Sequence, residues 1–224
     1  MNRSKIGLIT IGQSPRYDII GEMSILLRGN LEIIQRGALD YRSESEIKNL
    51  QPDADDFPMV TKLCDGSSIV VGKKKVTPLI QEPVDNLGAE GVDVSIILCT
   101  EPISGIKSRG ILISPWAVVI NTVKAIMDAG TIGVMIPLDE QQERAIGKWN
   151  STSFNVVTAM IPPYHIDFPC EEIVSEFKEA DVKLIVLDCI GYSMTLKDRL
   201  QNLTELPVIL PRSLVAAVIS ELVG

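Results

Sequence analysis

Two cysteines of this chain, Cys99 and Cys189, end a pattern that occurs twice, in residues 90–99 and 180–189. Each pattern is an apolar run of strand length that follows a segment with helical periodicity. A nearby helix N-terminus would lower the pKa of each thiol and favour the reactive thiolate. Two such thiols facing each other could take a proton from one face of a carbon atom and return one to the other. This is racemase chemistry without a cofactor. The alternative explanation of the repeated pattern is chance, because helix–strand units recur in every α/β protein and cysteine is often buried.

A second group of candidates follows the first expected strand, at residues 5–11. Ser14 is expected to cap the next helix. Arg16 would then stand just inside that helix, where its guanidinium and the N–H groups of residues 12–14 could hold a carboxylate. An exposed helix arginine is the equally weighted alternative.

Residues beside the two thiols could also contact a substrate. The hydroxyl of Thr100 could bind a carboxylate, and a turn or capping role fits its position equally well. Tyr192 and Ser193 could line the second half of a pocket or serve as ordinary loop residues. The predicted substrate-binding residues are Thr10, Gly12, Gln13, Arg16, Thr100, Tyr192 and Ser193.

Other polar and sulfur-bearing residues favour structural roles. Asp188 lies on a strand that is expected to be buried, where a carboxylate needs partners. Arg212 offers either another anion site or a helix cap, and His165, the single histidine, lies in an expected loop. Cys64 and Cys170 form no CxxC pair with any other cysteine, so the sequence predicts neither a zinc site nor a disulfide framework.

The hydrophobic period alternates between short strands and longer helices, which is typical of βαβ units with a mostly parallel sheet. The expected strands are residues 5–11, 31–36, 92–99, 111–113, 132–136, 155–161, 182–189 and 208–210. The expected helices are residues 15–28, 75–90, 115–128, 139–149, 170–179, 195–203 and 213–223. Asp65-Gly66, between residues 61–64 and 68–71, predicts a two-residue turn in a hairpin, and no element is assigned to the polar residues 40–58.

Composition and charge exclude several classes of protein. The chain has 224 residues, of which 46% are hydrophobic and 22% charged, so it can bury a core. The net charge of −8 and the absence of a basic run longer than Lys73-Lys74-Lys75 argue against nucleic-acid binding. Without a secretory signal or a membrane-spanning apolar stretch, a cytoplasmic protein that binds no membrane is expected. The apolar helix at residues 213–223 belongs either to a domain core or to the interface of a homodimer.

The cysteine motifs at residues 97–100 and 187–192 resemble those of the aspartate/glutamate racemase superfamily. Over nearly the whole chain the sequence is similar to one branch, the AroM family, through residues 9–16, 187–192 and 206–210. The family name refers to an association with genes of aromatic amino-acid biosynthesis. Racemases of acidic amino acids usually have Thr-His after the second cysteine, where this chain has Ile190-Gly191. Glutamate racemase activity is therefore not the expectation.

The resemblance implies an α/β fold of two Rossmann-like domains with mostly parallel sheets, related by pseudo-twofold symmetry. Residues 1–108 with 212–224 would form the first domain, and residues 109–211 the second. It also implies that Cys99 and Cys189 are catalytic thiols in an interdomain cleft, that no cofactor or metal is used, and that the substrate is a small carboxylate-bearing metabolite. The function would be that of a racemase, epimerase, isomerase or decarboxylase. The alternative is a non-catalytic protein that binds a small metabolite of aromatic amino-acid metabolism.

Overall fold

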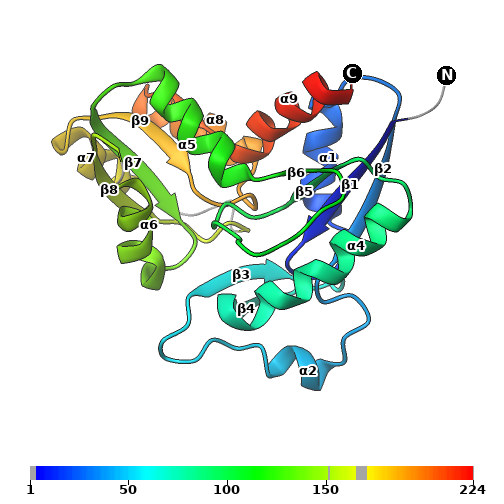
Figure 1. The fold of residues 1–224 in the computed structure, drawn as a ribbon. Coiled ribbons are helices and arrows are strands. Elements are labelled where there is room, and N and C mark those ends of the chain that lie inside the picture. The colour runs from blue at the N-terminus through cyan, green and yellow to red at the C-terminus, as the bar shows by residue number, and fades with distance from the viewer. Residues whose placement is uncertain (1–3, 151, 165–170, 224) are drawn as a thin grey trace. The chain divides into compact units, whose positions relative to one another are not determined.

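The computed structural model describes residues 4–150, 152–164 and 171–223 of the chain. The chain forms two compact units: unit 1 comprises Met1–Pro115 with Ala216–Gly224, and unit 2 comprises Trp116–Val215. Each unit contains a four-stranded parallel sheet with helices packed against it (Figure 1). The α/β class with mostly parallel sheets is thereby confirmed. Two residues considered above, His165 and Cys170, lie outside the described residues.

In unit 1 the strands of the sheet are ordered β2-β1-β5-β6. Its elements are β1 (Ser4–Thr10), α1 (Tyr17–Leu26), β2 (Leu31–Gly37), α2 (Glu44–Lys48), β3 (Pro58–Lys62), β4 (Ser68–Gly72), α3 (Lys73–Val76), the 3-10 helix η1 (Thr77–Ile80), α4 (Gln81–Ala89), β5 (Val94–Ile97) and β6 (Ile111–Ile113). Helix α4 packs closely on β1 because Gly7 has no side chain. A Cβ atom at Gly7 would lie 2.6 Å from Cδ1 of Leu87 on that helix.

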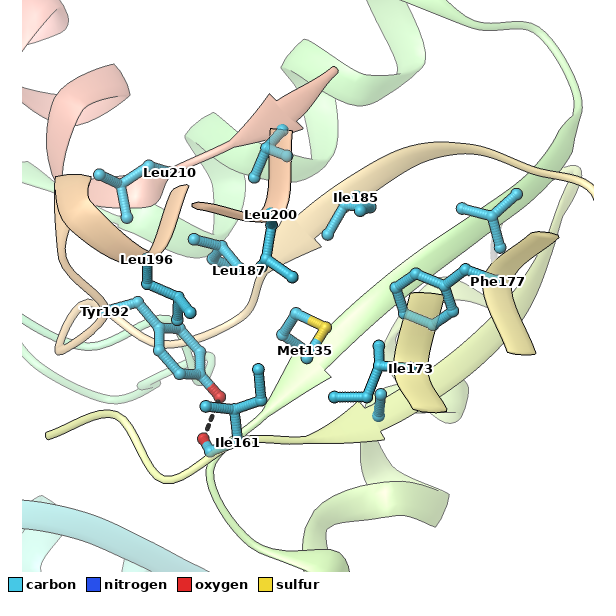
Figure 2. Close-up of a cluster of buried hydrophobic side chains, with 13 residues drawn as sticks. Met135, Ile161, Ile173, Phe177, Ile185, Leu187, Tyr192, Leu196, Leu200 and Leu210 are labelled. Atoms are coloured by element: carbon cyan, nitrogen blue, oxygen red, sulfur yellow. Dashed lines mark hydrogen bonds between the residues drawn. The ribbon is translucent and has the colours of Figure 1, made fainter. Parts of the chain in front are cut away.

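In unit 2 the order is β8-β7-β9-β10. Its elements are α5 (Pro115–Ile126, whose first residue belongs to unit 1), β7 (Gly130–Ile136), the 3-10 helix η2 (Asp139–Gln141), α6 (Gln142–Trp149), β8 (Phe154–Met160), α7 (Glu171–Glu179), β9 (Val182–Leu187), α8 (Met194–Thr204), β10 (Val208–Ile209) and α9 (Pro211–Val223, which continues into unit 1). Figure 2 shows one core cluster, in which Phe177 of α7 and Leu200 of α8 pack beside Ile185 of β9. A second cluster holds Val119 of α5 and Trp149 of α6.

The two sheets repeat one strand connectivity, with β1, β2, β5 and β6 corresponding to β7, β8, β9 and β10. The order of buried, half-buried and exposed residues is the same in 91–100 as in 181–190. The close contact of Gly7 with Leu87 also recurs, because a Cβ atom at Gly133 would lie 2.6 Å from the ring of Phe177. The repeat seen around the two cysteines therefore extends through the strands and helices that support them.

The start of the first helix differs from the sequence-based prediction. Helix α1 begins at Tyr17 with Arg16 at the N-cap position, and no side chain caps it. The prediction of Ser14 as the cap is wrong, because Ser14 is bound elsewhere. Its N–H donates to Oδ1 of Asp40 and its hydroxyl to Oδ2, both at 2.7 Å. Ser14 thus joins the loop after β1 to the loop after β2.

Unit 1 also contains a segment, here called the hairpin lobe (residues 38–76), between β2 and η1. Helix α2 in this lobe was not predicted, although Ser43 and Glu46 form a capping box, which is a sequence signal of a helix start. The hairpin is confirmed, but residues 63–67 connect β3 to β4 in place of a two-residue turn. The described residues between β8 and α7 in unit 2 form no such hairpin. Among all described residues, no helix has the length and apolar character needed to span a bilayer.

Candidate functional site

Cys99 lies just beyond the carboxyl end of β5, the edge at which open α/β sheets bind ligands. The chain turns sharply there, and the N–H of Cys99 donates to the carbonyl of Ile97 at 2.7 Å. The N–H of Glu101 donates to Sγ of Cys99 at 3.4 Å. A peptide N–H directed at sulfur favours the thiolate over the thiol. The half-buried Cys99 is therefore held in a defined position with a donor at its reactive atom.

Cys189 repeats this geometry beyond the carboxyl end of β9 in unit 2. Its N–H donates to the carbonyl of Leu187 at 2.8 Å, and the N–H of Gly191 donates to its Sγ at 3.3 Å. The loop is also held by Arg212, which is buried and donates from Nε to the carbonyl of Ile190 at 3.1 Å. The two thiols thus occupy equivalent positions in their units, down to the donor that reaches each sulfur. The expectation of a helix N-terminus beside each thiol is wrong for Cys99, because the chain between β5 and β6 forms no helix, whereas α8 begins soon after Cys189.

A buried carboxylate stands beside each thiol and is paired with a lysine. Next to Cys99, the side chain of Glu101 lies 2.7 Å from Nζ of Lys73. Next to Cys189, Asp188 forms an ion pair with Lys148, and both side chains are less than one-tenth exposed, at 3% and 7%. The ammonium of Lys148 also lies 5.0 Å from the centre of the Trp116 ring. Asp188 therefore has the partner that its burial requires.

Arg16 lies in a buried polar cluster at the carboxyl end of β1. Its side chain is 4% exposed, so the alternative of an exposed helix arginine is wrong. Nε and Nη2 donate to the two carboxylate oxygens of Asp18 at 2.9 and 2.8 Å, the bidentate arrangement typical of arginine. Nη1 and the N–H of Gly12 both donate to Oγ1 of Thr10, at 3.4 and 3.2 Å. The carboxylate that Arg16 binds is thus the side chain of Asp18 and not that of a substrate.

Gly12 and Gln13 attach the hairpin lobe to the loop after β1. A Cβ atom at Gly12 would lie 2.2 Å from the carbonyl oxygen of Lys62, so only glycine allows this approach. The N–H of Gln13 donates to the same oxygen at 3.0 Å. The side-chain amide of Gln13 donates to the carbonyl of Leu39 and accepts the N–H of Cys64. Both ends of that amide are therefore engaged with the main chain.

Tyr192 lies wholly within the core of unit 2. Its hydroxyl donates to the carbonyl of Ile161 at 2.8 Å, drawn as a dashed line in Figure 2. Burial, together with the nearby Cys189, Asp188 and Tyr164, raises the pKa of Tyr192 well above its ordinary value of 10.0. Tyr192 is thus a neutral donor that ties the Cys189 loop to the chain after β8.

The two remaining predicted residues flank the thiols. Ser193 caps α8, because its hydroxyl accepts the N–H of Leu196 at 3.2 Å. Thr100 follows Cys99 directly and is buried. The described part of the chain has no group of three or more His, Cys, Asp or Glu side chains that could hold a metal ion.

Sequence reasoning missed the lysine partners of both carboxylates. The sequence shows Lys73 only as part of a basic run and gives no signal for Lys148. A carboxylate at a position that is expected to be buried signals that a cation must approach it. The identity of that cation could not be found from spacing, because Lys73 and Glu101 stand 28 positions apart.

Comparison with known proteins assigns the family and the fold. Residues 6–223 match the family described as "AroM protein". The fold is similar to aspartate racemase of Picrophilus torridus (TM-score 0.67, 11% identity, 99% of this chain and 94% of that one) and to glutamate racemase of Francisella tularensis (0.61, 16%, 99% and 81%). It is also similar to maleate isomerase of Pseudomonas putida (TM-score 0.62, 11% identity, 99% of this chain and 93% of that one). A search of curated proteins found no match. The fold is thus that of the aspartate/glutamate racemases, and the chain belongs to the AroM family.

Proposed function

We propose that this protein is a cofactor-independent enzyme of the racemase and isomerase kind, acting on a small carboxylate with Cys99 and Cys189 as its acid–base pair. One observation carries the proposal. The two thiols stand at equivalent ends of two repeated sheets, and each sulfur accepts a peptide N–H two residues further along the chain. A peptide N–H at the sulfur favours the thiolate, which is the form that can take a proton from a substrate.

The proposed chemistry balances with these two groups alone. The thiolate of one cysteine takes the proton from the carbon next to the substrate carboxylate and becomes a thiol. The electron pair left on that carbon is delocalised into the carboxylate. The thiol of the other cysteine gives a proton to the opposite face of the carbon and becomes a thiolate. Each turnover exchanges the roles of the two cysteines and requires no oxidant or co-reactant.

Structures of similar fold support this class of chemistry. They include enzymes named for aspartate, glutamate and maleate, which are small molecules that carry carboxylates. An arylmalonate decarboxylase is also similar in fold, with 14% identity and a TM-score of 0.58. At these identities the likeness is one of fold, and the chemistry proposed for this chain rests on its own two thiols.

Among the predicted binding residues, we assign Thr100 the direct contact with the substrate carboxylate, because it follows Cys99 at the carboxyl end of β5. Thr10, Gly12, Gln13 and Arg16 would act by shaping the neighbouring loop, since their polar groups bind one another, Asp18 or the hairpin lobe. Tyr192 and Ser193 would likewise act by holding the Cys189 loop.

Proton exchange tests the proposal without a known product. A panel of small amino, hydroxy and dicarboxylic acids is incubated with the protein in D2O, and deuterium at the carbon next to the carboxylate is followed by NMR. We expect Cys99→Ser and Cys189→Ser to slow the exchange at least about 100-fold, the usual size of one acid–base contribution, without changing the circular dichroism. Cys64→Ser, at an exposed cysteine, is the matched control. Full exchange activity in both site variants would contradict the proposal.

A non-catalytic metabolite-binding protein is the second candidate, and one observation favours it. Ile190, directly after Cys189, is buried and apolar, so that position offers no polar side chain beside the second thiol. On this alternative, a ligand from the panel would bind tightly, binding would persist after both thiols are blocked, and no deuterium would enter the ligand.

A further inference from the structure

The basic run at the beginning of α3 makes three ion pairs of different character. Lys74 lies 2.5 Å from Asp55, and Lys75 lies 2.8 Å from Asp53. The side chains of these two aspartates are 82% and 67% exposed. Pairs between such exposed groups contribute little to stability, because water already solvates the charges. Lys73 is the exception, since its carboxylate partner is buried.

The partner of Lys73 is Glu101, whose side chain is only 5% exposed. Oε1 of Glu101 accepts a hydrogen bond from Nζ of Lys73 at 2.7 Å. Taking a carboxylate out of water has a cost that its pairing with a lysine offsets only in part. The same residue supplies the peptide N–H that binds Sγ of Cys99. One residue thus links a lysine of the hairpin lobe to a thiol.

We propose that Lys73 is a positioning residue for the Cys99 thiol, which it serves by holding Glu101 so that the Glu101 N–H stays on the sulfur. This inference rests on the proposed function only for the role of Cys99 as an acid–base group. Its geometry is independent of that use, because every contact lies within unit 1.

The position of Lys73 is itself fixed by main-chain contacts. Its N–H donates to the carbonyl of Phe57 at 2.9 Å, and the next N–H, of Lys74, donates to Oδ1 of Asp56 at 2.9 Å. The ionisable groups on these segments include Glu101, Lys73 and the buried Asp56, together with the exposed pairs that Lys74 and Lys75 form with Asp55 and Asp53. These two hydrogen bonds fix the backbone of Lys73, so its ammonium can define where the side chain of Glu101 lies.

The second thiol lacks this device and so serves as an internal control. The N–H that binds Cys189 comes from Gly191, which has no side chain for an ion pair to hold. The Cys189 loop is held instead by Arg212, through the carbonyl of Ile190. A change at Lys73 should consequently reach Cys99 and leave Cys189 unaffected.

The test is the pH profile of alkylation at each cysteine of the folded full chain, measured by peptide mass spectrometry. In Lys73→Met, we expect the thiolate fraction of Cys99 at neutral pH to fall about fivefold, the effect of one weakened hydrogen bond. The rate at high pH, which reports access to the sulfur, should stay unchanged, as should the whole profile of Cys189. Lys73→Arg should restore the profile of Cys99. Lys74→Met and Lys75→Met, from the same basic run, should alter neither cysteine.

Three results would overturn the inference: an unchanged Cys99 profile in Lys73→Met, an equal change at both cysteines, or the same change in the Lys74→Met control. Should Lys73→Met fail to fold, the double variant Lys73→Met/Glu101→Met replaces the buried pair by apolar side chains, and the same fivefold change at Cys99 is expected. None of these readouts requires a substrate. A protein without turnover but with the expected profiles would refute the proposed function and leave this inference standing.

Discussion

Asp188 stands directly before the second thiol at the position that Leu98 holds in unit 1, and both residues are buried. We expect Lys148→Met to lower the free energy of unfolding by about 3–5 kcal/mol, because it leaves the Asp188 carboxylate buried without its ion pair. Lys183→Met, which removes the exposed pair with Asp181, is the control and should change it by no more than about 1 kcal/mol. Urea denaturation measures both variants.

The same experiment can be extended by copying unit 1. In the double variant Lys148→Met/Asp188→Leu, position 188 of unit 2 has the same residue type as Leu98, the corresponding position of unit 1. Buried ion pairs replaced by well-packed apolar residues are often neutral or stabilising, so most of the lost stability should return. If the double variant is as unstable as the single one, packing around the lysine explains the loss better than the unpaired charge does.

Tyr192 makes the stability of unit 2 depend on pH in the alkaline range. Its pKa in the folded protein is raised well above 10.0, so folding favours the neutral phenol. This contribution is complete below the pKa of the unfolded state, near 10, and is lost as the pH rises towards the folded value. We therefore expect the free energy of unfolding to fall above pH 10, as followed by urea denaturation at a series of pH values.

Tyr192→Phe is the variant that isolates this effect. It should cost about 1–2 kcal/mol at neutral pH, because the carbonyl of Ile161 loses its buried donor. Its stability should then decline less above pH 10 than that of the unchanged protein. Parallel pH profiles of the two proteins would assign the alkaline loss to other groups.

Residue types and spacing predicted which thiols lie at the strand ends, but not the groups that hold them. Cys99 and Cys189 could be placed because a repeated local pattern sets their topological position. The bidentate hold of Arg16 on Asp18 could not be placed, because it depends on where the helix begins. The local pattern predicts Ser14 as the cap, which is wrong because the true partner of Ser14, Asp40, is distant in sequence.

At the level of elements, close packing of a helix on a strand gives a further prediction. Gly133 of β7 lies under the ring of Phe177, and a Cβ atom there would be 2.6 Å from it. Gly133→Ala should therefore destabilise the protein by about 1–3 kcal/mol through overpacking. Gly147→Ala, on α6 where the added Cβ meets nothing within 4 Å, should instead stabilise it by about 0.5–1 kcal/mol. Thermal unfolding of both variants checks the contrast, and equal effects would contradict it.

Strands and helices with a clear hydrophobic period were predictable, and the hairpin lobe was predictable only in part. β9 and α7 agree closely with the expected strand and helix, because a strand buried on both faces forms an apolar run and a helix with one buried face has a helical period. Helix α2 has no buried residue, so it leaves no such period and its capping box was the sole signal. The approach of the lobe to Gly12 depends on tertiary packing that no local pattern encodes.

For the whole molecule, the α/β class followed from the alternation of periods, and the repeat of two halves followed from the cysteine motifs. The paired glycines Gly7 and Gly133 could have extended that repeat, since Ile-Gly precedes an apolar pair in each strand. The substrate could not be predicted, because one fold supports racemisation, isomerisation and decarboxylation.

Unit 1 is assembled from two separated stretches of chain, whereas unit 2 is continuous. The second stretch of unit 1 is the later part of α9, whose Ser220 accepts the N–H of Arg28 just after α1. During synthesis on a ribosome, residues 116–215 of unit 2 are therefore made before the last stretch of unit 1. Unit 1 is consequently the unit whose synthesis begins first and ends last.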